Sequence, residues 1–199
     1  MLGDVPLDEK ALETVLSQMG HDGLLNDEWL HKSEHSLELQ LYWLQHILDD
    51  RPFTVLPFLA GSLPPGINGT PRGNEYTELI LKALKAAERA HDGPVLWVAS
   101  VDFAHVGPSF GDSELVSDSL AARVEKQDMD ALQTLKQADP DQWWSHLMQD
   151  RNARRVCGQN AAWFLLRCLE SVEGYVIDYD QALSQGRERM VSFASTLFL

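Results

Sequence analysis

The chain has 199 residues, a formal net charge of -14 at pH 7 and 44% hydrophobic residues. This length and apolar content predict a single folded domain over positions 1–199 and argue against a disordered chain. The net negative charge argues against general binding to nucleic acid or to an anionic membrane surface. The two cysteines are far apart and not in a Cys-x-x-Cys pair, which argues against a disulfide scaffold and a structural zinc knuckle. A polar start and the lack of a long apolar stretch predict a cytoplasmic protein.

The predicted elements alternate between helices and short strands for most of the chain. In chain order they are helices at 7–19 and 33–48, a strand at 54–59, a helix at 75–90, a strand at 94–101, helices from 112 or 113 to 127, at 129–137, at 141–149 and at 158–171, and strands at 175–179 and 190–198. This order predicts an α/β fold with a mostly parallel central sheet flanked by helices, closed by an antiparallel pair of strands. Four strands make a small sheet, and the chain opens on a helix. We therefore expect the first strands of the fold to be missing, or a homodimer to complete the sheet.

Asp102 and His105 follow the predicted strand at 94–101, in the sequence SVDFAHVG. Ligands bind at the carboxyl ends of strands in open α/β sheets. A carboxylate near an imidazole orients the ring and raises its basicity, and the same pair could bind a metal ion. The alternative is that Asp102 caps a turn and His105 is a loop residue. Spacing alone leaves both interpretations open.

His35 lies at the start of the second predicted helix, in the sequence KSEHSLELQ. Glu34, His35 and Glu38 can share one end of a helix that is otherwise apolar. Ser33 can cap this helix, and Glu34 in the first turn favours the helix dipole. A polar site and ordinary capping with a surface histidine both agree with this pattern.

Cys157 directly precedes the predicted helix at 158–171, in the sequence RNARRVCGQN. A thiol at a helix N-terminus is pushed toward the thiolate, and the neighbouring Arg154 and Arg155 act in the same direction. Cys157 is therefore a candidate metal ligand or nucleophile, and the two arginines are a candidate anion site. The alternative is that Cys157 is a small buried hydrophobic residue.

Five stretches of the chain, taken in order, resemble the Memo family, which is related in fold to the class III extradiol ring-cleavage dioxygenases. They are EHSLELQLYWLQ, FTVLPFLAG, VASVDFAHVG, VCGQNAAWFLL and MVSFASTLFL. The resemblance spans nearly the whole chain, which looks like the C-terminal two-thirds of the family fold. It implies one Memo-like domain that lacks the family's N-terminal strands.

The resemblance also implies roles for the candidate residues. It implies that Cys157 is a metal ligand, that His105 is an acid–base group oriented by Asp102, and that His35 lies beside the same pocket. The metal would be iron, copper or zinc. The family's two further metal-binding histidines lie in His-Ala-Gly-like and Gly-Pro-x-His-like motifs, and neither motif occurs in this sequence. The resemblance therefore implies a metal site that is incomplete in this chain.

Three hypotheses of function follow. The first is a pocket related to those of non-haem metal-dependent dioxygenases, with a small molecule or a peptide as its ligand. The second is a metal-free binding or scaffold module, in which Arg154 and Arg155 take an anionic or phosphorylated ligand. The third is nucleophilic catalysis by Cys157 with His105 as its base. The sequence does not decide among them.

Overall fold

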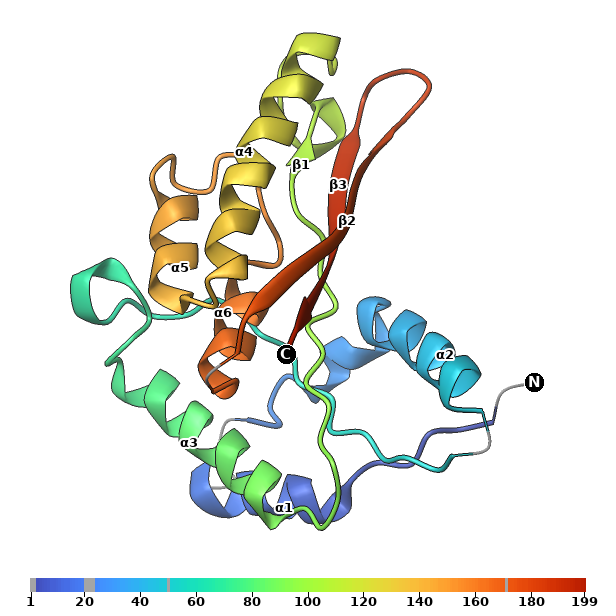
Figure 1. Cartoon of the computed structure of the whole chain (residues 1–199), viewed down its shortest axis with the longest axis vertical. Coiled ribbons are helices and arrows are strands. Elements are labelled where there is room, and N and C mark those ends of the chain that lie inside the picture. Colours follow the sequence, from blue (N-terminus) through green and yellow to red (C-terminus); the bar gives the residue numbers. More distant parts are fainter. Residues whose placement is uncertain (1–2, 20–23, 50, 171) are drawn as a thin grey trace. The chain divides into compact units, whose positions relative to one another are not determined.

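A computed structural model of the chain describes residues 3–19, 24–49, 51–170 and 172–199. The chain divides into two compact units, Met1–Ile67 with Pro71–Ser100 and Asn68–Thr70 with Val101–Leu199. Figure 1 labels their helices and strands. The architecture is α/β, with six α-helices and a small sheet among the described residues. The single domain expected from the sequence stays a prediction.

The first unit contains three helices and a 3-10 turn at Glu28–Lys32. The helices are α1 (Glu9–Met19), α2 (Ser36–Leu48) and α3 (Glu75–Ala90). All three were predicted from the sequence, over 7–19, 33–48 and 75–90. Helices α1 and α3 pack together (Figure 1) and supply the buried apolar side chains of this unit, including Val15, Leu16 and Leu84. Helix α2 has no buried residue.

The predicted strands at 54–59 and 94–101 are wrong. The first forms a single parallel bridge, between Leu7 and Val55, and the second forms no ladder. Among the described residues, the main chain of 94–101 finds no main-chain hydrogen-bond partner. A strand needs a neighbouring strand to bond its N–H and C=O groups. The apolar side chains that suggested burial are exposed instead, with Leu96 at 70% and Val98 at 49%.

The second unit contains α4 (Asp118–Lys136), α5 (Pro140–Met148) and α6 (Gln159–Cys168). Helix α4 is one continuous helix, whereas the sequence predicted two helices, at 112–127 and 129–137. Its N-cap is Ser117, whose hydroxyl accepts the amide of Leu120, and not Asp112 or Ser113. The sequence from 127 to 129 has no Pro or Gly to break the helix. The predicted end of the last helix, at position 171, lies outside the described residues.

The sheet of the second unit has the order β1-β3-β2 and is antiparallel throughout, which corrects the mostly parallel sheet expected from the sequence. Its strands are β1 (His105–Val106), β2 (Gly174–Leu183) and β3 (Met190–Phe198). The closing pair β2–β3 was predicted as antiparallel, and this is confirmed. Strand β1 joins the other edge of β3 through His105 and Val191. Parallel pairing would have needed the strands expected at 54–59 and 94–101.

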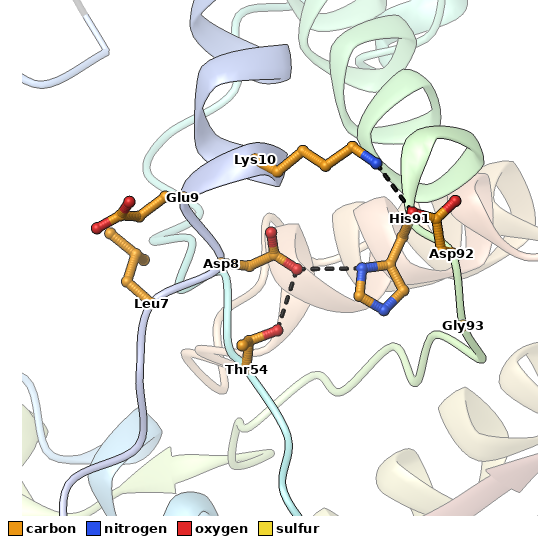
Figure 2. A pocket seen from close by; sticks show the side chains of 8 residues that line it. All are labelled: Leu7, Asp8, Glu9, Lys10, Thr54, His91, Asp92 and Gly93. Carbon is orange, nitrogen blue, oxygen red and sulfur yellow. Dashed lines mark hydrogen bonds and ion pairs between the residues drawn. The ribbon is translucent and has the colours of Figure 1, made fainter.

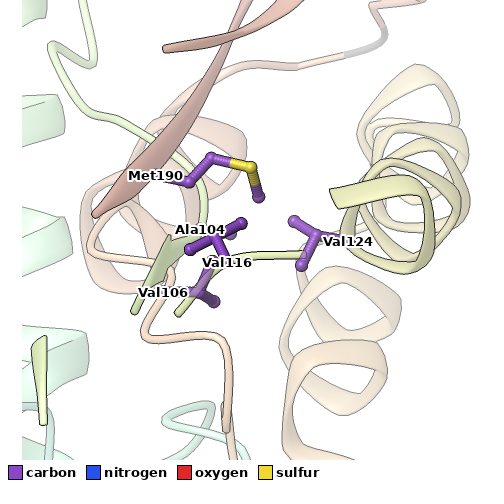
Figure 3. Packing of buried hydrophobic residues seen from close by; sticks show 5 residues of the cluster. All are labelled: Ala104, Val106, Val116, Val124 and Met190. Carbon is purple, nitrogen blue, oxygen red and sulfur yellow. The ribbon is translucent and has the colours of Figure 1, made fainter. Parts of the chain in front are cut away.

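A cluster of buried apolar side chains packs between β1, β3 and α4 (Figure 3). It consists of Ala104, Val106, Val116, Val124 and Met190, all nearly or fully buried. Two of its members flank His105 in the sequence. Burial of its neighbours therefore fixes the place of His105 at the edge of the sheet.

Candidate functional site

Asp102 and His105 lie side by side where the extended chain enters β1. Asp102 Oδ2 is 3.9 Å from His105 Nε2, within the range of an ion pair when the ring is protonated. The side chain of His105 is 19% exposed and that of Asp102 is 51% exposed. The structure thus places an accessible carboxylate next to a largely covered imidazole.

Two carbonyl groups fix the ring of His105. Its Nδ1 is 3.1 Å from the carbonyl oxygen of Phe103 and 3.1 Å from that of Arg155. Because carbonyl oxygens only accept hydrogen bonds, this geometry assigns the N–H to Nδ1. In the neutral ring, Nε2 is then the nitrogen that can accept a proton, and it faces Asp102. The ring of Phe110 stands edge-on to the imidazole, with 5.0 Å between the centroids.

Cys157 contacts the main chain of Asp102. It is exposed and lies two positions before α6. Its Sγ is 3.3 Å from the main-chain nitrogen and 3.3 Å from the main-chain oxygen of Asp102. The amide of Gly158 donates to that oxygen as well, at 3.2 Å. Asp102, His105 and Cys157 therefore form one group at the surface, called the Asp102 cluster below.

Arg154 and Arg155, predicted as an anion site, both have carboxylate partners. The Nε of Arg154 donates to Asp128 at 3.0 Å, and Arg154 is 6% exposed. Arg155 makes a two-point contact with Asp112 and also donates to the carbonyl of His105 at 3.0 Å. The Arg155 hydrogen bond lowers the pKa of Asp112, and so does the amide of Gly107, which donates to it. An anion would have to displace these carboxylates.

His35 lies in the first unit, at the N-cap position of α2, and its side chain is 82% exposed. Its side chain makes no capping hydrogen bond. Glu34 does so instead: one carboxylate oxygen accepts the amides of His35 and Ser36. These bonds lower the pKa of Glu34, with the Ser36 amide as the largest cause. The polar residues at the start of α2 therefore cap the helix, and the capping side chain is that of Glu34 and not that of Ser33.

The donor atoms of the Asp102 cluster do not by themselves fit a metal ion. Among the described residues, no group of three or more His, Cys, Asp and Glu side chains is arranged to hold one. His35 belongs to the other unit and adds no ligand that the structure places at the cluster.

A shallow hollow in the first unit contains none of the predicted site residues (Figure 2). At its centre, Asp8 accepts hydrogen bonds from Thr54 at 3.0 Å and from the amide of Ala11 at 2.9 Å, and it lies 3.1 Å from Nδ1 of His91. The Ala11 amide is the main reason that the pKa of Asp8 is lowered. Asp8 therefore caps the start of α1, which gives this carboxylate a structural role.

Two carboxylates near the Asp102 cluster were not singled out from the sequence. Position 112 was predicted only as one of two possible starts of the helix that reaches 127. Asp128 lies on the buried stripe of α4 with Val124 and Leu132. A single acidic residue on an otherwise apolar helical stripe could have marked Asp128 as a buried carboxylate. Such a group needs hydrogen-bond donors around it.

The chain was compared with known proteins. The model of the family described as "Memo-like protein" matches residues 1–197. A "MEMO1 family protein" of Aquifex aeolicus is 26% identical over 99% of this chain and 48% of its own length. A "MEMO1 family protein" of Thermococcus onnurineus is 26% identical over 99% of this chain and 66% of its own length. The "Protein memo-1 homolog" of Caenorhabditis elegans is 30% identical over 85% of this chain and 45% of its own length.

The chain thus spans about half the length of two of these relatives and about two thirds of the third. Within the part of the chain that the structure describes, no helix has the length and apolar character needed to cross a membrane.

Proposed function

Because the chain belongs to the Memo family, we propose that the Asp102 cluster is a proton-transfer site in a pocket related to those of the non-haem metal-dependent dioxygenases. The observation that carries this proposal is the orientation of His105. Two carbonyls hold its Nδ1–H, so that Nε2 faces Asp102. A ring fixed in one tautomer beside a carboxylate is the arrangement that general acid–base catalysis uses.

Each member of the cluster has its own role in this proposal. His105 takes up or releases a proton at Nε2, and the Asp102 carboxylate stabilises the protonated ring. Cys157 presents its thiol next to the main chain of Asp102. The ligand is a small molecule or a peptide, and the protein works in the cytoplasm.

A metal ion would supply Lewis-acid or redox chemistry to such a pocket. The described residues do not fit it, because the cluster lacks a third donor in ligating position. The proposal therefore rests on proton transfer by His105 alone. Cys157 could serve a metal ion only together with ligands from outside the cluster.

The reactivity of Cys157 tests whether its thiol and His105 share a site. If the imidazole of His105 takes up the proton of the Cys157 thiol and so favours the thiolate, iodoacetamide should alkylate Cys157 at least about threefold more slowly in His105→Gln. Asp102→Asn should give a smaller decrease. Mass spectrometry of the peptides separates Cys157 from Cys168, which is buried in α6 and reports on unfolding.

His46→Gln is the matched control, since His46 is an exposed histidine of α2 in the other unit. Its Cys157 should react at the wild-type rate. Equal alkylation rates in wild type and His105→Gln, with both proteins folded, would remove the shared site from the proposal.

The second hypothesis, a metal-free module for a phosphorylated ligand, has weaker support. Arg154 and Arg155 already face Asp128 and Asp112, and the chain has a formal net charge of -14. If this alternative holds, millimolar inorganic phosphate should raise the melting temperature by mass action, and Arg155→Gln should abolish the increase.

A further inference from the structure

Asp128 is a carboxylate in the interior of the second unit, and the proposed proton transfer does not use it. It lies in the middle of α4 and is fully buried. Burial raises its pKa, because the charged form loses its hydration. A buried carboxylate is tolerated only when hydrogen-bond donors surround it. The donors of Asp128 therefore show which segments of the chain it connects.

Three side chains from three different segments donate to Asp128. Arg154 donates through Nε to one carboxylate oxygen at 3.0 Å. Tyr179 on β2 donates to the other oxygen at 3.0 Å, and the hydroxyl of Ser192 on β3 donates to that same oxygen. Both oxygens of Asp128 are thus engaged, and the carboxylate joins α4, the sheet and the loop before α6.

Two of these three partners lead directly to the Asp102 cluster. The hydroxyl of Ser192 accepts the amide of Ala104 at 2.9 Å, and the main chain of Ser192 bonds to Phe103 and Ala104. The carbonyl of Arg154 accepts the amide of His105 at 2.7 Å. The next carbonyl along this loop, that of Arg155, holds Nδ1 of the His105 ring.

The loop that carries Arg154 and Cys157 does not hold its shape by regular secondary structure. Arg151, Asn152 and Arg155 have φ values of 59°, 53° and 56°, in the left-handed region that non-glycine residues rarely adopt. Such a backbone persists only where surrounding contacts determine it. The buried Arg154–Asp128 pair is one of these contacts. The amide and carbonyl of Val156, both bonded to the side chain of Asn152, are others.

We propose that Asp128 is a positioning residue for the Asp102 cluster: through Ser192 it fixes the chain that carries His105, and through Arg154 it fixes the loop that carries Cys157. It touches no reacting group itself. One carboxylate thereby sets the separation of two segments about fifty positions apart in the sequence. This inference rests on the proposed function for the use of the cluster, but its geometry can be tested without any activity.

The test compares Asp128→Asn with wild type by nitrogen-15 NMR and hydrogen exchange. In Asp128→Asn we expect the Nδ1–H signal of the His105 ring to broaden or disappear. We also expect the amide of His105 to exchange at least about tenfold faster, because its acceptor on Arg154 is no longer fixed. The amides of the β2–β3 ladder should exchange as in wild type, which separates loss of position from general destabilisation.

Two variants serve as matched controls. Asp150→Asn removes the other carboxylate near Arg154, a partly exposed one at 3.8 Å, and should leave both His105 signals unchanged. Tyr179→Phe removes the donor to Asp128 that lies on β2 and leaves the Ser192 and Arg154 side chains in place, so it should leave the His105 signals largely intact. If Asp128→Asn does not fold, Ser192→Ala replaces it, with faster exchange of the Ala104 amide as the expected result.

Wild-type His105 signals in a folded Asp128→Asn protein would overturn the inference, as would equal changes in Asp128→Asn and Asp150→Asn. The proposed function can fail separately. If Asp128→Asn releases the His105 ring while His105→Gln has no effect on Cys157 alkylation, then Asp128 positions a histidine that does not act on the thiol.

Discussion

Cys157 and Asp102 are 55 positions apart in the sequence, yet the thiol of one lies 3.3 Å from both the main-chain nitrogen and the main-chain oxygen of the other. A single sulfur atom therefore bridges the two segments of the cluster. Because it meets main-chain atoms, the contact depends on the thiol and not on the side chain at position 102.

Cys157→Ala tests this bridge. We expect it to lower the free energy of unfolding by about 1 kcal/mol, the usual net value of one hydrogen-bonding group. Cys157→Ser keeps a group that donates and accepts, so it should recover part of that loss. Urea unfolding of both variants measures the difference. Equal stability of the Ala variant and wild type would mean that the sulfur contacts contribute nothing.

A cobalt(II) titration tests the fit of a metal ion. The described residues give the Asp102 cluster no third donor in ligating position. We therefore expect cobalt(II) at equimolar concentration to produce no thiolate-to-metal absorption band with the purified chain. A stoichiometric band that is lost in both Cys157→Ser and His105→Gln would contradict this and show that further ligands complete the site.

The sequence predicted the helices well because apolar residues recur at helical spacing, which also marked α2 although none of its residues is buried. Helix α3 has the predicted bounds, Glu75–Ala90. The strands at 54–59 and 94–101 failed for a physical reason. An apolar run of this length shows that a segment can be buried in a sheet, but not that neighbouring strands are present to pair with it.

The site could be predicted as far as residue types and strand ends allow. Asp102 and His105 were found from their spacing, and Cys157 from its place before a helix. Their meeting in one cluster could not be derived from spacing, since it depends on how Gly158 and the loop before α6 approach Asp102. The carboxylate partners of Arg154 and Arg155 depend on the same long-range packing. Two neighbouring arginines before Cys157 therefore suggested an anion site where the structure has ion pairs.

Gly158→Ala tests the close approach at the start of α6. A Cβ at this position would lie 2.7 Å from Cγ2 of Val101 and 3.1 Å from the carbonyl oxygen of Asp102. We expect the substitution to cost about 1–3 kcal/mol of stability, as overpacking does, and to change the Cys157 contact. Gly61→Ala is the control, because no atom of the described residues lies within 4 Å of a Cβ added at that position, and it should change stability by about 0.5 kcal/mol or less. Thermal unfolding compares them.

Asp112→Asn tests the ion pair with Arg155 through pH. The pKa of Asp112 is lower in the folded chain than in the unfolded chain. Its stabilising contribution is therefore present above the unfolded value of about 4 and is lost as pH falls through the folded value. Asp112→Asn should be less stable than wild type at pH 7, and the difference should shrink below about pH 4. Since about a third of each side chain is exposed, screening keeps the effect to about 1 kcal/mol or less.

The comparison for Asp112→Asn is urea unfolding at pH 7 and pH 3. Asp118→Asn is a useful control, because Asp118 is 91% exposed although it pairs with Arg187. Its stability at pH 7 should stay close to that of wild type, because solvent screens an exposed ion pair. A difference between Asp112→Asn and wild type that grows toward acid would contradict the assigned direction.

Residues 95–99 should be the least protected apolar segment of the chain. Among the described residues their main chain has no main-chain partner, and Leu96 and Val98 are largely exposed. We therefore expect their amides to exchange at close to unprotected rates in dilute protein, in contrast to the β2–β3 ladder. Leu96→Lys should change monomer stability by about 0.5 kcal/mol or less, because the side chain is not buried.

The concentration dependence of this exchange tests the homodimer that the short sheet suggested. The run 94–101 contains no charged residue, so antiparallel pairing with a second copy would not place like charges opposite each other, although each chain carries -14 overall. If a second copy pairs there, protection of 95–99 should increase with protein concentration together with the mass in light scattering, and Leu96→Lys should abolish both increases. Exchange that stays fast at every concentration would mean that this chain does not complete its sheet by self-association.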